Sequence, residues 1–245
     1  MAKSNFVTYQ IYPTSFYDSN GDGVGDIQGI ISKLRYIKEL GCDSIWINPI
    51  YESDFLDGGY DVNNFYKIDP RFGNMSDLEE LIKSCHKRDI KIFLDLVCGH
   101  LSVKSREFVE SSKSNFGEYS DLLESAGNIH SFMKNSDDLY NSGTIQFTND
   151  KNIKTSELNL VDGDYQRNGL YVSNYYDFQP ALNFGFNLVK EPWQISYKDN
   201  RISNTKKYVL DVMRFYLSKG VDGFRVDMAY SLVKNDPNRI ATIEV

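Results

Sequence analysis

The sequence is poor in cysteine, histidine and proline, and it has no long apolar run. Its three cysteines, Cys42, Cys85 and Cys98, are odd in number and have no metal-ligand spacing, which excludes a disulfide framework and a structural zinc site. We expect buried free thiols in a reducing compartment, and therefore a cytoplasmic location. The start of the chain has no apolar stretch of the signal-peptide kind, and no segment is long enough to cross a bilayer.

The sequence also lacks any block of positive charge. Its formal net charge is −7 over 245 residues, so attraction to nucleic acid or to an anionic membrane surface is not expected. A hydrophobic content of 41% and an aromatic content of 14% are typical of a globular protein with one large core or two smaller ones.

What the sequence does contain is an alternation of strand and helix signals. Short runs of β-branched, aromatic and apolar residues predict strands at 6–13, 42–51, 91–100 and 221–228, and the runs at 42–51 and 91–100 indicate buried strands. Apolar residues at helical spacing predict helices at 26–41, 75–90 and 205–220. We expect Ser76 to cap the second helix, with Glu79 completing a capping box. Repeated βα units favour a parallel sheet, either a (β/α) barrel or a doubly wound fold.

The alternation is interrupted between about residues 101 and 183. This segment is polar, rich in Asn, Ser, Asp and Tyr, and has no clear period. It is too long for an ordinary βα connection, so it predicts an inserted subdomain or lid.

The stretch DSNGDGVGD predicts a cation site. Asp18, Asn20, Asp22 and Asp26 offer side-chain oxygens at close spacing, and Val24 can add its backbone carbonyl. Oxygen ligands on glycine-rich turns suit calcium. The alternative interpretation is an Asx-rich turn without a metal.

Two kinds of motif at strand ends point to a catalytic site. In GFRVD, Arg225 and Asp227 are two residues apart on a predicted strand, so both side chains lie on one face and the guanidinium keeps the carboxylate ionised. The alternative is a structural ion pair. In GGYDV and DLVCGH, Tyr60, Asp61 and His100 have the chemistry to stack on a sugar and bond its hydroxyls, although a structural role would also account for the histidine.

Taken together, the segments QIYPTSFYDSNGDGVGD, GGYDV, DLVCGH, FQPALNFGF and GFRVDM resemble the alpha-amylase family of glycosidases, glycoside hydrolase family 13. The resemblance implies an α/β fold, the first half of a TIM (β/α)8 barrel (strands 1–4) with a domain B between strand 3 and helix 3. It divides the chain into barrel at 1–100, the domain B-like insertion at 101–183, and barrel again at 184–245.

The resemblance also assigns roles. It makes Asp227 the nucleophile of a retaining mechanism, oriented and ionised by Arg225, with Asp95 holding that arginine. Tyr60, Asp61 and His100 then line the subsite of the attacked glucose, and the loop with Asp18, Asn20, Asp22, Val24 and Asp26 corresponds to the calcium loop of bacterial alpha-glucosidases. The expected substrate is an alpha-glucoside or alpha-glucan oligosaccharide.

The sequence departs from the family at three places. Gly99 stands where many members carry an Asn, and Ala181 replaces a usual Asp. The residues after Asp227, 228–231, lack the Lys-His pair of many alpha-amylases, which favours short alpha-glucosides as substrates over long starch chains.

A retaining glycosidase needs a second carboxyl group about 5–5.5 Å from the first. Glu244 follows Asp227 by 17 residues, in a segment where Asp236 and Pro237 predict a helix start, so we expect Glu244 on a helix away from the catalytic mouth. We therefore expect the chain to be truncated within the fourth barrel helix, to lack the general acid and to be inactive in isolation, and to self-associate through open sheet edges. The alternatives are a non-catalytic sugar- or protein-binding remnant of the amylase fold, and an alpha-glucosyl transferase or isomerase of the same family.

Overall fold

The computed structural model describes residues 6–112, 147–148, 159–162, 170–190 and 194–245. Within these residues the chain forms two compact units. The first comprises the chain up to Leu96 together with Val212–Asp227, and the second comprises Val97–Asp211 together with Met228–Val245.

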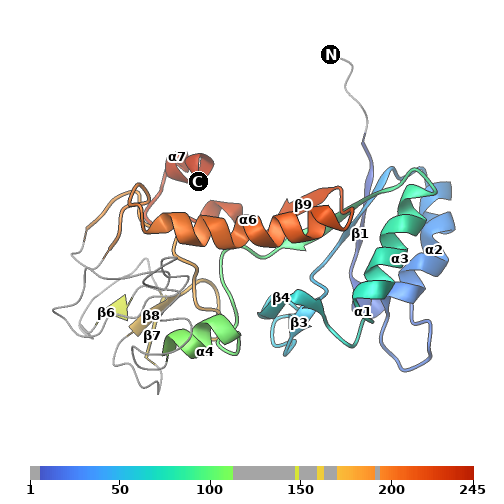
Figure 1. The fold of residues 1–245 in the computed structure, drawn as a ribbon, viewed down its shortest axis with the longest axis horizontal. Coiled ribbons are helices and arrows are strands. Elements are labelled where there is room, and N and C mark those ends of the chain that lie inside the picture. Colours follow the sequence, from blue (N-terminus) through green and yellow to red (C-terminus); the bar gives the residue numbers. More distant parts are fainter. Residues whose placement is uncertain (1–5, 113–146, 149–158, 163–169, 191–193) are drawn as a thin grey trace, which may run out of the picture. The chain divides into compact units, whose positions relative to one another are not determined.

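A four-stranded parallel sheet is the centre of the first unit (Figure 1). Its strands, in spatial order, are β1 (Thr8–Ile11), β2 (Ser44–Ile47), β5 (Lys91–Leu96) and β9 (Gly223–Val226). Each pairs with the next in parallel register, so all four strands end at the same edge of the sheet. The order and direction of the strands are those of a partial (β/α) barrel, as the sequence predicts.

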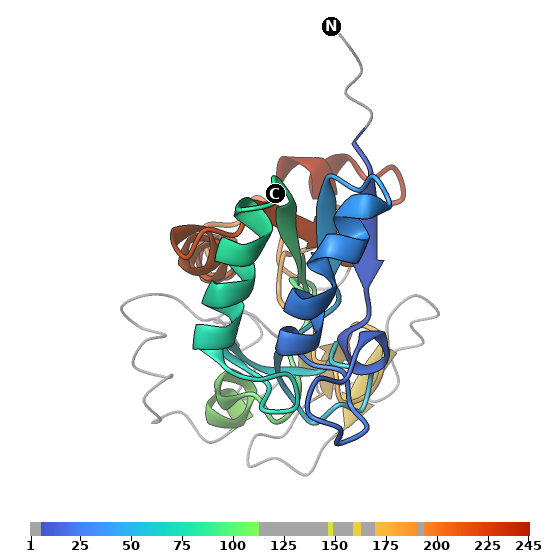
Figure 2. The same ribbon diagram turned by 90° about the vertical axis from the view of Figure 1, so that its right-hand side faces the viewer.

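Two amphipathic helices, α2 (Ile27–Glu39) and α3 (Met75–His86), pack side by side against this sheet, as Figure 2 shows. Asp26 caps α2 by accepting the amide of Gly29 at 2.6 Å. The cap of α3 differs from our prediction, because Asn74 and not Ser76 is the N-cap. The Asn74 side chain accepts the amides of Ser76 and Asp77, and Asp77 returns the bond, so the capping box lies two residues earlier than expected.

The remaining elements of the first unit are short except for one helix. A four-residue helix, α1 (Pro13–Phe16), follows β1, and an antiparallel hairpin of β3 (Tyr51–Ser53) and β4 (Val62–Ile68) follows β2. The helix α6 spans Ile202–Ser218, and its last turns belong to this unit. There Tyr216 is fully buried, contacts the ring of Tyr51 and donates its hydroxyl to the carbonyl of Phe65.

The second unit contains a small sheet and short helices. Its elements are α4 (Arg106–Ser112), β6 (Phe147–Thr148), β7 (Asn159–Asp162), β8 (Leu170–Ser173), the 3-10 turn η2 (Ala229–Ser231) and α7 (Ile240–Glu244), and β8 is the middle strand. Much of the predicted insertion at 101–183 lies outside the described residues.

The last helix begins later than the sequence indicates. The N-cap is Arg239 and not Asp236, and α7 begins at Ile240, so Pro237 precedes the helix. The Asp236 carboxylate still accepts the amides of Ile240 and Thr242 from outside the helix. Asn235 and Arg239, both at positive φ, turn the chain before the helix starts.

The three cysteines are buried free thiols, as predicted. Burial raises the pKa of the Cys85 thiol to about 12, so it stays protonated at neutral pH. Among the helices that the structure describes, none is long and apolar enough to cross a membrane.

Candidate active site

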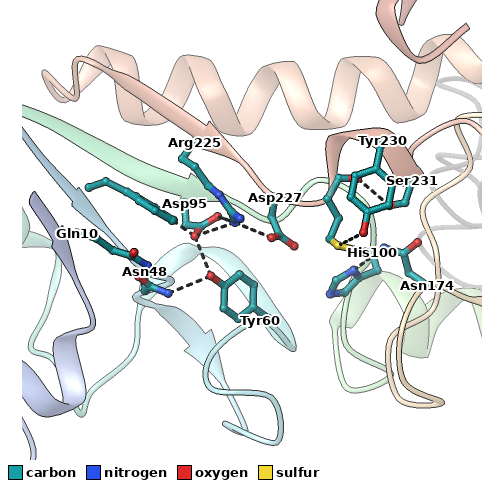
Figure 3. Close-up of polar contacts among 12 residues, drawn as sticks. Gln10, Asn48, Tyr60, Asp95, His100, Asn174, Arg225, Asp227, Tyr230 and Ser231 are labelled. Carbon is teal, nitrogen blue, oxygen red and sulfur yellow. Dashed lines mark hydrogen bonds and ion pairs between the residues drawn. The ribbon is translucent and has the colours of Figure 1, made fainter. Parts of the chain in front are cut away.

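Arg225 lies between two carboxylates at the ends of adjacent strands (Figure 3). Its Nη1 donates to Asp227 Oδ1 at 2.6 Å and to the two oxygens of Asp95 at 3.1 and 3.2 Å. Asp95 is 1% exposed and Asp227 is 9% exposed, whereas the Arg225 side chain that they share is 39% exposed, so the two acids are buried and the cation reaches water. One guanidinium therefore neutralises two buried acids, the requirement for keeping such groups charged.

The sheet register produces this cluster. Asp95 and Arg225 are directly paired between β5 and β9, and the Asp227 amide donates to the carbonyl of Leu96 at 3.0 Å. Because alternate strand residues share a face, Asp227 lies on the same side as Arg225, one step beyond it toward the C-terminal edge. The carboxyl edge of a parallel sheet is where barrel enzymes place their chemistry.

Burial and charge act against each other at Asp95. Burial raises the pKa of Asp95 to about 6, although Arg225 and the hydroxyl of Tyr60 lower it. Burial also works to lower the pKa of Arg225, but the two carboxylates outweigh it and the net shift is upward. Arg225 thus remains a cation at neutral pH.

A line of hydrogen bonds extends from this cluster across the sheet to β1 (Figure 3). Gln10 donates to Asn48 at 2.9 Å, Asn48 donates to the Tyr60 hydroxyl at 3.0 Å, and that hydroxyl donates to Asp95 at 2.9 Å. Burial, and then the charge of Asp95, raise the pKa of Tyr60, so its hydroxyl keeps the proton that it donates. Each donor faces an acceptor along the whole line, which orients every amide in it.

Sequence reasoning missed Gln10, Asn48 and Trp46. The Trp46 ring lies under the Arg225 guanidinium, 4.8 Å from ring centroid to Cζ, and its indole N–H donates to Asp95 at 3.2 Å. These residues belong to strand ends, in YQIYP and IWINP, and that position is the signal that could have identified them.

The predicted substrate-binding residues lie in different places. Tyr60 belongs to the line just described. Asp61 is fully buried, and its carboxylate accepts the amides of Leu56 and Asp57 at 3.1 and 3.0 Å, so it shapes the loop before it. His100 belongs to the second unit, where it is 3% exposed and its Nδ1 lies 3.1 Å from Asn174 Nδ2.

Gly99, where the sequence departs from the family, leaves room for Asn174. A Cβ at position 99 would lie 2.8 Å from Asn174 Nδ2, closer than such contacts allow. Ala181, the second departure, forms a bridge with His100 and is 4% exposed.

The loop of the predicted calcium site is exposed and has oxygen-donor chemistry. Asp18 accepts the amides of Asn20, Gly21 and Gly23, hydrogen bonds that hold its pKa below the ordinary value, and Asp22 accepts the amide of Val24. These turn contacts are compatible with either interpretation of the loop.

Asp26, the last predicted side-chain ligand, is already bound through both oxygens. They accept from Gly29 and from Ser19, so Asp26 serves the helix start. Of the predicted calcium ligands, this leaves the side chains of Asp18, Asn20 and Asp22 and the Val24 carbonyl. No group of three His, Cys, Asp or Glu side chains with metal-binding geometry occurs in the part of the chain that the structure describes.

Glu244 lies in α7 of the second unit. Its carboxylate accepts a hydrogen bond from the Tyr197 hydroxyl at 2.8 Å. This contact involves an exposed pair and gives Glu244 a local structural partner.

Comparisons with known proteins agree on one family. The profile described as alpha amylase, catalytic domain, matches residues 10–242. The oligo-1,6-glucosidase of Bacillus cereus is 36% identical over 231 residues, which is 94% of this chain and 36% of that protein.

Solved structures that resemble this chain are also enzymes that act on sugars. The crystal structure of Bacillus licheniformis trehalose-6-phosphate hydrolase has a TM-score of 0.67 and 33% identity, over 92% of this chain and 35% of that one. The isomaltulose synthase from Erwinia rhapontici NX5 has a TM-score of 0.67 and 30% identity, again over 92% and 35%. The chain thus spans about a third of the length of the relatives that it matches.

Proposed function

This chain belongs to the alpha-amylase family of glycoside hydrolases, and from that premise we propose that it provides the nucleophile side of an active site that cleaves alpha-glucosidic bonds of short oligosaccharides with retention. The observation that carries the proposal is the contact of 2.6 Å between Arg225 and Asp227 at the carboxyl edge of the sheet. It supports an ionised, oriented carboxylate, the form in which an aspartate attacks.

In the proposed reaction, an Asp227 oxygen attacks the anomeric carbon while the bond to the leaving oxygen breaks. A second carboxyl group protonates that oxygen, and water then hydrolyses the glucosyl ester with overall retention. We assign the second role to none of the described residues, because Asp95 is bound to Arg225 and Glu244 is bound to Tyr197. Tyr60, Asp61 and His100 are proposed to bind the attacked glucose.

The test is hydrolysis of a nitrophenyl alpha-glucoside by the protein purified from its source cells at native length. We expect the alpha anomer to appear first in the NMR spectrum, and Asp227→Asn to lower the rate by a factor on the order of 10⁴ to 10⁶. Glu39→Gln, which removes one exposed carboxylate of an ion pair with Arg35, is the control and should leave the rate unchanged. Release of the beta anomer first, or an active Asp227→Asn variant, would refute the assignment.

A second candidate is transfer of the glucosyl group to a sugar hydroxyl in place of water. The specific support is the likeness to an isomaltulose synthase at the same TM-score as to a hydrolase. The two reactions share the Asp227 step and differ in the acceptor. Product analysis by NMR with sucrose separates them, because hydrolysis yields free glucose and fructose, whereas transfer yields a new glycosidic linkage.

We also propose calcium as a structural ion of the 18–26 loop. The support is the set of hard oxygen donors on Asp18, Asn20 and Asp22 in a single exposed turn. The ion takes no part in the proposed chemistry.

A further inference from the structure

Three side chains of the second unit are connected in a line that ends at the buried His100. Asn174 Nδ2 lies 3.1 Å from His100 Nδ1, and Asn174 Oδ1 accepts from Lys234 Nζ at 2.8 Å. Lys234 Nζ also donates to the carbonyl of Ser231 at 2.6 Å. The histidine and asparagine of this line are drawn in Figure 3.

The chemistry of the lysine determines the direction of both contacts. An amino group of lysine at neutral pH only donates, so the atom of Asn174 that faces it must be the amide oxygen. The amide nitrogen of Asn174, which also only donates, then faces His100 Nδ1. That ring nitrogen must therefore accept, which leaves the ring proton on Nε2.

Backbone hydrogen bonds fix the positions of His100 and Asn174. The segment 179–182 pairs with the residues around His100 on one side, through Leu101 N to Pro180 O and Leu182 N to Gly99 O. It also pairs with the residues around Asn174, through Asn174 N to Gln179 O and Ala181 N to Val172 O. Residues 179–182 thus hydrogen-bond both to the segment of His100 and to the segment of Asn174, which fixes the position of the two side chains relative to each other.

Lys234 is held in a similar way. Its amide donates to the carbonyl of Gly185, and its own carbonyl accepts the amide of Asn187, both at 2.9 Å. The residue as a whole is half-buried, and desolvation lowers the pKa of Lys234 to about 8, which leaves the ammonium group mostly protonated at pH 7. Among the described residues, the acceptors of its Nζ are the uncharged oxygens of Asn174 and Ser231, so Lys234 acts as a donor to Asn174 and not as half of an ion pair.

We propose that Asn174 and Lys234 are positioning residues that hold His100 in the tautomer with its proton on Nε2. The part that His100 takes in binding the attacked glucose rests on the proposed function. The tautomer does not, because it follows from the three contacts alone.

The first test uses NMR of the unmodified protein labelled with ¹⁵N-histidine at pH 7. We expect the His100 Nδ1 resonance at the position of an unprotonated ring nitrogen and Nε2 at that of a protonated one. A proton on Nδ1 of His100 would overturn the proposal. His86 is an internal reference, because its Nε2 contacts the Asp222 carboxylate at 2.9 Å and must carry a proton.

The second test reverses the polarity of the contact. Asn174→Asp replaces the donor facing His100 by an acceptor and retains a partner for Lys234, so we expect Nδ1 of His100 to become protonated. Asn200→Asp makes the same chemical change at an exposed residue of the same unit and should leave the His100 spectrum unchanged. An unaltered His100 spectrum in the Asn174→Asp variant would show that Asn174 does not set the tautomer.

The third test removes the lysine donor. Lys234→Met keeps the length of the side chain but frees the Asn174 amide to turn over, so we expect the spectrum of a mixture of His100 tautomers. A spectrum with Nδ1 still fully unprotonated would remove Lys234 from the proposal.

Activity of the native-length protein then separates this inference from the proposed function. We expect Asn174→Asp to lower kcat/KM roughly tenfold, as the loss of one oriented hydrogen bond predicts, while Asn200→Asp has no effect. The predicted tautomer in a protein without glycosidase activity would contradict the proposed function and leave the positioning role intact. Full activity of Asn174→Asp with Nδ1 protonated would show that the tautomer is irrelevant to the reaction.

Discussion

Arg225 balances two carboxylates that approach it from neighbouring strands. Without the guanidinium, Asp95 and Asp227 would be two largely buried acids on adjacent strands, and one of them would be expected to take up a proton. Trp46 and Tyr60 also donate to Asp95, whereas among the described contacts Asp227 Oδ1 alone accepts a side-chain hydrogen bond. These different partners support the proposed roles, in which Asp95 holds the arginine and Asp227 attacks.

The raised pKa of Asp95 predicts an unusual pH dependence of stability. Its value of about 6 in the folded protein exceeds its ordinary value of 3.8, so the folded protein binds this proton more tightly than the unfolded chain. The stabilisation is fully present below about pH 4 and is lost as the pH rises through about 6. We expect the unfolding free energy of the wild type relative to Asp95→Asn to fall by up to about 3 kcal/mol over this interval.

Urea denaturation of both proteins from pH 4 to pH 7 provides the measurement. A relative stability that rises with pH in this range would mean that the ion pair with Arg225 outweighs burial and that the pKa of Asp95 is lowered. If the proposed function holds, the same titration predicts that glycosidase activity falls below about pH 6, where Asp95 becomes neutral and its ion pair with Arg225 is lost.

Among the elements, α2 shows how a close backbone approach determines residue choice. Gly29 lies in the first turn of α2, where a Cβ would be 2.0 Å from the carbonyl oxygen of Tyr17. An exposed glycine in a helix costs about 1 kcal/mol relative to alanine, yet this backbone contact cannot yield as a side chain would. Packing therefore outweighs helix propensity at this position.

We expect Gly29→Ala to destabilise the protein by about 1–3 kcal/mol, the range for overpacked sites, despite its better helix propensity. Ser32→Ala, at an exposed position in the same helix, should change stability by less than about 1 kcal/mol. The melting temperatures of the two variants and the wild type provide the comparison. A stabilising Gly29→Ala would show that the loop at Tyr17 moves away at little cost.

The loop before α2, residues 18–26, is proposed to bind calcium. If Asp18, Asn20 and Asp22 bind calcium, adding calcium should raise the melting temperature of the wild type, and EGTA should reverse the rise. Asp22→Ala should abolish this response, whereas Asp43→Ala, a change outside the loop, should retain it. An identical response of Asp22→Ala and the wild type would place any bound calcium elsewhere.

Elements with a strong local signal were predictable from the sequence, and those that depend on distant partners were not. Short apolar runs predicted the four strands, and apolar residues at helical spacing predicted α2, α3 and α6. The spacing of two residues on a strand predicted that Arg225 and Asp227 lie together. The hairpin of β3 and β4 was missed because β4 does not alternate between buried and exposed residues. Gln10, Asn48 and Trp46 were missed because their partners lie 12 to 49 residues away, a distance that no local pattern shows.

For the whole molecule, the outer strands of the sheet in the first unit are exposed. In the described part of the chain, β1 and β9 each pair with a single neighbouring strand. Apolar side chains are exposed there, with Val7 at 47% and Val226 at 41%. Unpaired strand edges with exposed apolar residues are templates for pairing with another chain.

We therefore expect the 245-residue chain to self-associate in a concentration-dependent manner in sedimentation velocity experiments. Val226→Lys should reduce the association, because a charge on an edge strand opposes pairing. Ile243→Lys is the matched control: Ile243 is 85% exposed but lies in α7 and not at the sheet edge. A monomeric wild-type chain, or an equal effect of both variants, would contradict a role for the sheet edge.

Covalent trapping with a fluorinated alpha-glucosyl fluoride tests the proposed role of Asp227 as the nucleophile. In this reagent the bond between C1 and fluorine breaks as the ester to Asp227 forms, and fluoride leaves without needing a protonating group. After treatment of the native-length protein and digestion, we predict that the peptide containing Asp227 gains one fluoroglucosyl group. Label on a different carboxylate, or turnover by an Asp227→Asn variant at the wild-type rate, would contradict the account.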